Sequence, residues 1–338
     1  MDGHDEQLIW GAQKLIWEGQ QEALNSYPLV SSSSWAGSIQ RDIIKFGQSS
    51  APLLWPSVQQ DPCLDVSVIM MVKDEADVIG ENLHWLYFVG VRRFVVIDNN
   101  SSDRTPKIID EFRYLSKEIE MLLIHDPVMR YFQKEKTTGM FHFARSVWPD
   151  LKWVFPIDAD EFLIPQLGFD PLKELSPDVD AITIPKVIHS LSKESFGYDP
   201  DALFNMPIRS HFYVVPPKVA ARVNSEASIE QGNHFVSFPH GKSPKHASGM
   251  HLGLYYREFP TRSFAQFLRK VRNGGLAIQA AKKYDSLRSC GGDHWTSYYE
   301  ALVNGGEEAL FKVFQDQFVH APTGGWTTDP FPGCPKTI

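Results

Sequence analysis

The chain has 338 residues, of which 43% are hydrophobic and 22% are charged, the proportions of an ordinary soluble globular protein. Thirty-three basic and forty-one acidic residues give a net charge of −8, which argues against a general nucleic-acid binder. At this length we expect about two domains, or one large domain with additions.

The cysteines are few, odd in number and widely spaced, so they indicate neither a disulfide framework nor a zinc site. No apolar run approaches the roughly 20 residues of a membrane span, and the acidic N-terminus lacks the pattern of a signal peptide. We therefore expect a cytoplasmic protein without a transmembrane segment. Any membrane contact would be peripheral, at the inner face.

The first 62 residues are predicted to form a helical extension and a linker. Apolar side chains between residues 7 and 24, including Trp10 and Trp17, recur at roughly helical spacing and predict an amphipathic helix. Packing of its apolar face on the main domain is favoured over a partner or a membrane. A serine run at 31–34 and several prolines then precede a domain boundary near Cys63.

From Val66 the pattern changes to short apolar strands that alternate with helices. Strand, helix, strand in repetition predicts an α/β domain with a mostly parallel, doubly wound sheet, which we place at residues 63–260. Residues 261–338 are predicted to be a C-terminal helical segment that packs on it. The expected strands cover residues 66–72, 93–97, 120–124 and 153–157, and the expected helices cover 76–89, 106–114 and 139–147.

Three carboxylates within four residues, Asp158, Asp160 and Glu161, follow the last of these strands. In extended chain Asp158 and Asp160 project to the same side, and two such charges repel unless a cation lies between them. Mg²⁺ or Mn²⁺ is commonly held by one or two carboxylates with substrate phosphates completing its shell. A metal diphosphate site is one interpretation, and a solvated acidic turn is the other.

Two further polar clusters follow the first two predicted strands, at residues 73–75 and 98–105. In doubly wound sheets, ligands bind beyond the carboxyl ends of the strands, near the point where the strand order reverses. Because all three clusters are expected at this edge, the pattern favours the functional interpretation of the carboxylates.

Basic residues in the C-terminal half are the candidates for contact with phosphate. Lys218 lies in an otherwise apolar predicted strand, where a surface salt bridge is the equally open alternative. A helix from Arg262 to about Ala281 also carries Lys270, and the pair Gly274-Gly275 is expected to interrupt it.

Several blocks of sequence resemble family 2 glycosyltransferases of the GT-A fold, and they cover residues 65–299. The C-terminal half also resembles a bacterial subgroup of that family. The order and spacing of the blocks are more specific than any single one. The blocks are Val68-Ile69-Met70-Met71-Val72-Lys73-Asp74-Glu75, Val95-Val96-Ile97-Asp98-Asn99-Asn100-Ser101-Ser102-Asp103-Arg104-Thr105, Asp158-Ala159-Asp160-Glu161-Phe162, Lys218-Val219-Ala220-Ala221-Arg222, Gly232-Asn233-His234-Phe235-Val236, Phe259-Pro260-Thr261-Arg262-Ser263-Phe264-Ala265-Gln266-Phe267, Lys270-Val271-Arg272-Asn273-Gly274-Gly275 and His294-Trp295.

This resemblance implies a metal-dependent enzyme that transfers a sugar, with inversion, from a nucleotide diphosphate sugar to the hydroxyl of a saccharide or other acceptor. A UDP-sugar is the first expectation for the donor, and Mn²⁺ or Mg²⁺ for the metal. Asp158 and Asp160 would hold the metal, with Asp160 counted as catalytic. Asp98 would bind the base or ribose, and Lys73 and Glu75 would line the nucleotide pocket.

Each of these assignments has a structural alternative. The cluster that begins at Asp98 could only cap the following helix, and Glu75 could be a first-turn carboxylate that stabilises the helix dipole. Asp293, beside His294 and Trp295, is the candidate for the general base that deprotonates the acceptor.

One position departs from the subgroup pattern, because Glu258 stands where a histidine commonly precedes the Phe-Pro pair. Either Glu258 is a third metal ligand, or His251 has taken over that role, or the site is weakened. Two other function classes also stay open. A nucleotidyltransferase would usually carry a glycine-rich basic loop after its first strand, and a noncatalytic nucleotide or glycan binder would lack the complete metal set.

Overall fold

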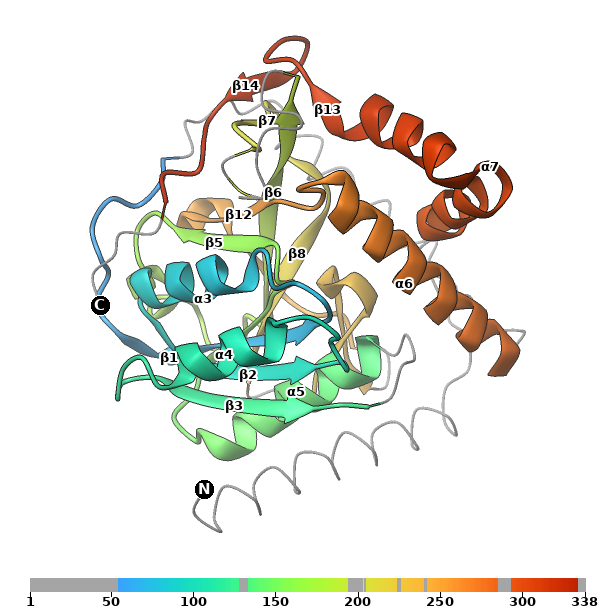
Figure 1. Ribbon diagram of the computed structural model, residues 1–338. Helices are drawn as coiled ribbons and strands as arrows, with labels where there is room; N and C mark the ends of the chain where they lie inside the picture. The colour runs from blue at the N-terminus through green and yellow to red at the C-terminus, as the bar shows by residue number, and fades with distance from the viewer. Residues whose placement is uncertain are drawn as a thin grey trace.

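The computed structural model of the protein describes residues 54–127, 133–193, 203, 205–223, 226–239, 242–284 and 293–333. The helix predicted over residues 7–24 lies outside these ranges, as do Cys290 and Cys334. The described residues form a large central sheet with helices on both of its faces and the helical segments α6 (Phe264–Tyr284) and α7 (Asp293–Phe318) at one side (Figure 1).

The first half of the sheet is parallel, in the order β4-β1-β2-β3, and each strand is joined to the next by a helix. Successive buried residues of β1 point to opposite faces. Val68 and Met70 pack in one core with α3 and α4, whereas Ile69 packs in a second core with α5. These elements are β1 (Cys63–Val72), α3 (Ile79–Phe88), β2 (Val91–Asp98), α4 (Thr105–Arg113), β3 (Glu120–His125), α5 (Gln133–Val147) and β4 (Trp153–Pro156).

The second half of the sheet is mixed. Strand β8 pairs antiparallel with β4 on one side and with β6 on the other, and β6 also takes β7, β11, β12 and β13 as neighbours. Strand β5 pairs antiparallel with β12, which brings the segment after β4 beside a strand about 90 residues later in the chain. The strands are β5 (Glu161–Pro165), β6 (Ala181–Ser192), β7 (Ile208–Ser210), β8 (Val214–Arg222), β11 (His246–Ser248), β12 (Leu254–Glu258), β13 (Val319–His320) and β14 (Trp326–Thr328).

Short elements connect these strands. A separate two-stranded ribbon of β9 and β10 packs beside α5, and one-turn 3-10 helices lie in the described loops. They are β9 (Ser228–Ile229), β10 (Val236–Ser237), η1 (Asp170–Leu172), η2 (Gln231–Asn233) and η4 (Met250–Leu252).

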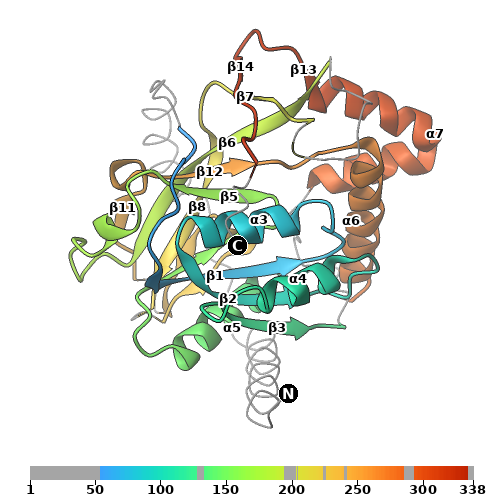
Figure 2. The ribbon, with the colours of Figure 1, turned by 60° about the vertical axis from the view of Figure 1, so that its left-hand side comes forward.

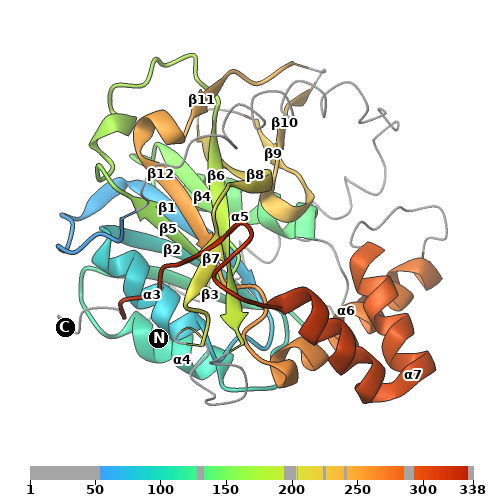
Figure 3. The ribbon, with the colours of Figure 1, turned by 90° about the horizontal axis from the view of Figure 1, so that it is seen from above.

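Helices α6 and α7 follow β12 and pack together (Figure 3). The span of α7 consists of two helical stretches joined by a kink at Gly306, where φ is 71° and ψ is −171°. Aromatic rings hold them together, such as Phe267 against Tyr298 and Phe264 against Phe311. After α7 the chain returns to the sheet, where β13 pairs with β6 and β14 pairs with β7.

The predicted interruption of the helix at Gly274-Gly275 is wrong, because α6 runs through both residues. A Cβ atom added at Gly275 would lie 2.2 Å from the ring of Tyr299 on α7. The absence of a side chain at Gly275 therefore allows α6 and α7 to pack closely, and this packing outweighs the low helix propensity of glycine.

The predicted fold class is confirmed. Every strand and helix expected between residues 66 and 157 is present, although α3 begins three residues later than expected and α5 six residues earlier. Among the described residues, no helix has the length and apolar character needed to cross a bilayer. The domain limits at residues 62 and 260 stay predictions.

Candidate active site

The three polar clusters lie at one edge of the sheet, because β1, β2 and β4 are parallel and end side by side. The arrowheads of β1, β2 and β3 point toward the side of the molecule where α6 lies (Figure 2). Hydrogen bonds join the first two loops: Asp74 accepts from the backbone N–H of Ser102 at 2.7 Å, and Ser101 accepts from that of Asp74 at 2.9 Å. The site is therefore built on the carboxyl ends of the parallel strands.

Asp158 follows β4 and has both carboxylate oxygens in polar contacts, with 34% of its side chain exposed. Its Oδ2 accepts a hydrogen bond from the ammonium group of Lys218 at 2.8 Å. Its Oδ1 accepts from the side-chain amides of Asn233 at 3.2 Å and Gln133 at 3.4 Å. Three elements far apart in the sequence, α5, β8 and η2, thus converge on this carboxylate.

Asp160 is buried and contacts two cations from the start of the C-terminal helices. Lys270, on α6, lies 2.8 Å from its Oδ2, and Arg262, just before α6, lies 3.6 Å from it. Burial alone would raise the pKa of Asp160, but Lys270 and Arg262 outweigh it and hold that pKa below its usual value. Asp160 is therefore an ionised carboxylate in a largely desolvated position.

Glu75 and Asp77 complete the set of partners around Arg262. The guanidinium contacts both oxygens of Asp77 at 2.9 Å and also pairs with Glu75, which in turn lies 3.0 Å from Lys270. Burial opposes the charged forms of Lys270 and Arg262, yet the neighbouring carboxylates raise the pKa of both side chains. Asp77 is a residue that the sequence analysis did not single out.

Glu161 is the first residue of β5 and is completely buried. Its Oε1 lies 2.8 Å from the ammonium of Lys218, and its Oε2 accepts a hydrogen bond from the backbone N–H of Asp158. Burial, with the nearby charges of Asp158 and Glu258, outweighs Lys218 and raises the pKa of Glu161 to about 8.

The structure separates the two alternatives for the position before Phe259. Glu258 lies directly opposite Glu161 in the β5–β12 pair and forms an ion pair with Lys186 at 2.7 Å. His251 lies in η4, before the opposite end of β12, where Leu254 faces Pro165. Four residue steps along β5 place that end about 13 Å from Glu161, so His251 does not reach the carboxylates.

Asp98 is the last residue of β2 and is almost fully buried. It accepts a hydrogen bond from the backbone N–H of Ser101 at 3.3 Å and lies 3.5 Å from Nδ1 of His125. Lys73 reaches across from the first loop and donates to the backbone carbonyl of Asn100 at 2.7 Å. Both residues thus belong to the joined loops that follow β1 and β2.

Asp293 is the first residue of α7, and its side chain lies outside the described part of the structure. Its assignment as the general base stays a prediction. Three amide side chains that the sequence analysis did not single out also reach the site: Gln133 and Asn233 at Asp158, and Asn273, which donates to Asp74 at 2.8 Å. Asn233 and Asn273 stand inside the resembling blocks, which is a signal that could have identified them.

The residues at this edge fit a divalent metal whose shell is completed by phosphate oxygens. Asp158 and Asp160 offer two hard oxygen ligands, the number with which Mg²⁺ is usually held beside a diphosphate. Across the described ranges no group of three or more His, Cys, Asp or Glu side chains is arranged to hold a metal without a substrate. Both aspartates also carry an ammonium group on one oxygen.

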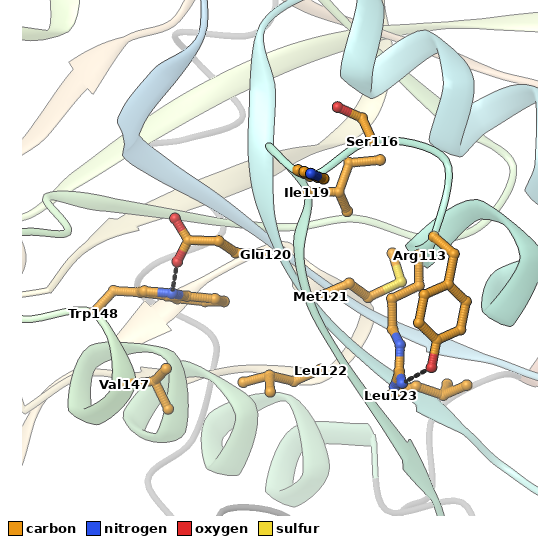
Figure 4. Close-up of a pocket in the computed structure, with 11 residues that line it drawn as sticks. Arg113, Ser116, Ile119, Glu120, Met121, Leu122, Leu123, Val147 and Trp148 are labelled. Carbon is orange, nitrogen blue, oxygen red and sulfur yellow. Dashed lines mark hydrogen bonds between the residues drawn. The ribbon is translucent and has the colours of Figure 1, made fainter. Parts of the chain in front are cut away.

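A separate cavity of about 460 Å³ lies along the first residues of β3 (Figure 4). It is bordered by the ends of α4 and α5, including Arg113 and Trp148, and the indole of Trp148 donates to Glu120. This is the amino end of the strand, on the opposite side from Asp98 and Asp158. The cavity is therefore no part of the candidate site.

No protein-family model matches the chain, and no curated protein does. Among solved structures, the chain is similar to the mannosyltransferase PcManGT from Pyrobaculum calidifontis in complex with GDP-Man and Mn²⁺. The identity is 14% and the TM-score 0.35, over 92% of this chain and 87% of that one. It is also similar to HddC from Yersinia pseudotuberculosis, with 13% identity and a TM-score of 0.30, over 54% of this chain and 88% of that one. Similarity at this level does not identify a family, so the function is argued from the site.

Proposed function

We propose that this protein is a glycosyltransferase of the family 2 type, which transfers a sugar from a nucleotide diphosphate sugar to an acceptor hydroxyl. The observation that carries the proposal is the pair Asp158 and Asp160 at the carboxyl edge of the parallel strands, surrounded by Lys218, Lys270 and Arg262. Carboxylates for a metal and cations for phosphate oxygens are what a diphosphate leaving group requires.

The nucleoside would lie over the loops after β1 and β2. Asp98 ends β2 and can accept hydrogen bonds from a ribose hydroxyl or a base N–H, as carboxylates at this position do in doubly wound folds. A UDP-sugar remains our first choice to test.

The diphosphate would lie between the loop after β4 and the start of α6. Lys270 and Arg262 project from the α6 side and Lys218 from β8, so basic groups flank Asp158 and Asp160 on two sides. When bound there, Mg²⁺ or Mn²⁺ would act as a Lewis acid that neutralises charge on the departing nucleoside diphosphate.

Transfer with inversion also requires a base near the acceptor hydroxyl. Asp293 stays our candidate, because it begins α7 and this helix packs on α6, which carries Lys270. A saccharide or another hydroxyl compound would be the acceptor.

The test is to incubate the purified protein with a panel of nucleotide sugars and Mn²⁺, and to measure release of nucleoside diphosphate with and without a chelator. Asp158→Asn should lower turnover by about 100-fold or more, the scale of losing one group that stabilises developing charge. Asp150→Asn, before the other end of β4 with its carboxylate at Arg93, is the matched control and should leave turnover unchanged. Release that is equal in wild type and Asp158→Asn would contradict the proposal.

A further inference from the structure

Each aspartate at the strand edge already has a cation in contact with one oxygen. The ammonium of Lys218 lies 2.8 Å from Oδ2 of Asp158, and that of Lys270 lies 2.8 Å from Oδ2 of Asp160. Each lysine also contacts a second acidic side chain, Lys218 that of Glu161 at 2.8 Å and Lys270 that of Glu75 at 3.0 Å. A divalent ion that bound these aspartates through their Oδ2 atoms would compete with the two ammonium groups.

The bridges are not equally secure. Lys218 donates two hydrogen bonds, to Oδ2 of Asp158 and to the backbone carbonyl of Gly232, each at 2.8 Å, and only 3% of its side chain is exposed. Lys270 contacts two carboxylates and has 24% of its side chain exposed. A lysine side chain is a compact charge on a flexible stem. Because Lys270 is more exposed than Lys218, its ammonium group can leave Asp160 at a lower free-energy cost than that of Lys218 can leave Asp158.

Each bridge joins an ammonium group to two acidic side chains at 2.8–3.0 Å. A bridge opens when the ammonium gains another anionic acceptor. A diphosphate offers several charged oxygens at once, and an ammonium that moves to them uncovers a carboxylate oxygen for a metal.

Building on the proposed function, we propose that in the free protein Lys218 and Lys270 occupy carboxylate oxygens of Asp158 and Asp160 that bind a divalent metal in the nucleotide complex. When a diphosphate binds, the two ammonium groups move to its oxygens and the metal takes their positions. We call this the placeholder role of the two lysines. The metal then binds weakly to the free protein and tightly to the nucleotide complex. The two lysines do not contact the metal in the free protein or in the nucleotide complex, because their ammonium groups move from carboxylate oxygens to phosphate oxygens.

The experiment measures binding of Mn²⁺ by electron paramagnetic resonance, without turnover. Full-length protein is titrated with Mn²⁺ alone and with UDP or GDP present, and the Mn²⁺ that the nucleotide takes up in a protein-free sample is subtracted. Wild type should bind Mn²⁺ at least about fivefold more tightly with the nucleotide, the lower limit of common coupling between two ligands.

A direct metal–phosphate bond would also give this coupling, so the variants decide the question. Lys270→Met should bind Mn²⁺ alone about fivefold or more tightly than wild type, because the competing charge is gone. Lys218→Met is the second variant and should act in the same direction at Asp158. Arg272→Met is the matched control: it removes a cation two residues further along α6, whose partner is the exposed Glu307, and should leave Mn²⁺ affinity unchanged.

The outcomes separate the two proposals. If both lysine variants bind Mn²⁺ alone no better than wild type, or if Arg272→Met gains as much, the placeholder role is wrong while the glycosyltransferase proposal stands. If wild type binds Mn²⁺ equally well with and without the nucleotide, the placeholder role is again wrong. If no nucleoside diphosphate binds with Mn²⁺ present, both proposals fail.

Discussion

Two clusters of buried charge in the described part of the chain differ in the balance of their ions. The edge cluster, which consists of Glu75, Asp77, Asp158, Asp160, Glu161, Lys218, Lys270 and Arg262, has more acids than bases. In the Asp329 cluster, as far as the described residues show it, the carboxylate of Asp329 pairs with two guanidinium groups, those of Arg257 at 2.8 Å and Arg209 at 2.6 Å. Among the described residues, the first cluster thus has more acids than bases and the second has more bases than acids.

The surroundings of the two clusters differ as well. Asp329 also accepts from the indole of Trp55, whose ring lies 4.0 Å from the guanidinium of Arg257. Phe331 packs against the same indole. The Asp329 cluster thus fastens both ends of the described chain to the sheet. The edge cluster instead leaves a third of Asp158 and a quarter of Lys270 in contact with solvent. The guanidinium groups of the Asp329 cluster have a rigid, planar geometry that favours a permanent structural contact. The ammonium groups of the edge cluster lie on flexible side chains, which favours exchange of their partners with a ligand.

The comparison is tested most strongly by removing one acid from each cluster. Asp329→Asn should lower the free energy of unfolding by about 3 kcal/mol or more, since it removes the carboxylate that pairs with two largely buried cations. Asp158→Asn should cost clearly less, because Lys218 keeps Glu161 and the carbonyl of Gly232. Urea unfolding of both variants measures this. If the two variants lose the same free energy of unfolding, the excess of acidic residues in the edge cluster does not reduce the cost of removing Asp158.

A second prediction concerns a carboxylate of the site that serves a ligand rather than the fold. Asp98→Ala should weaken nucleoside diphosphate binding by about 1–3 kcal/mol, the scale of a hydrogen bond to a charged group, as measured by calorimetry. Asp103→Ala is the control in the same loop, because its carboxylate accepts from the backbone N–H groups of Thr105 and Ala76. It should lower stability and leave nucleotide affinity unchanged. The reverse pattern would make Asp98 a purely structural residue.

The contrast between the clusters also shows what the sequence could reveal. Periodicity was sufficient for the strands of the parallel half, because buried strands such as β1 and β2 read as continuous apolar runs. The carboxylates Asp98, Asp158 and Asp160 were found because polar residues directly after such strands must lie at one edge. These inferences depend only on local patterns and on one topological rule.

Pairings between distant segments could not be predicted in this way. Lys270 meets Asp160 across 110 residues, and Arg257 meets Asp329 across 72. Such contacts depend on how β12 and α6 return to the sheet, which no local pattern encodes. Gly275 is the clearest error, since its low helix propensity predicted a break, whereas its contact with Tyr299 preserves the helix. Asp329 lies beyond the resembling blocks and was not noticed.

The exclusion of water from the Asp329 cluster can be tested through the protonation of His189, which contacts Arg257 of that cluster. The ring of His189 stacks on that of Phe259, with 4.2 Å between the ring centres. Arg257 can only donate, so Nε2 of His189 must accept from it and Nδ1 must donate to the carbonyl of Met206. Burial, reinforced by the charge of Arg257, lowers the pKa of His189 to about 3. The native histidine therefore stays neutral while the unfolded one binds a proton below pH 6.5.

The sign of the effect follows from the depressed pKa. The contribution of His189 to stability is present above the unfolded pKa and is lost as the pH falls toward the folded one, by up to about 1.4 kcal/mol per pH unit. His189→Gln should reduce the decline in unfolding free energy between about pH 6.5 and pH 4, measured by urea unfolding at each pH. Identical slopes for wild type and variant would show that water reaches this ring in the native state.

The smallest effect is expected from an ion pair that belongs to neither cluster. Arg272 on α6 lies 2.7 Å from Glu307 on α7, and about half of each side chain is exposed. Water screens such a pair, and ordering two long side chains offsets most of its attraction, so Arg272→Met should cost only about 0.2–1 kcal/mol. The cost should shrink further in high salt, because ions screen exposed pairs more than buried ones. A loss as large as that of Asp329→Asn, and insensitive to salt, would mean that the α6–α7 contact depends on this pair rather than on Phe267, Tyr298 and Gly275. In that case the position of Lys270 at the site would also depend on a surface charge.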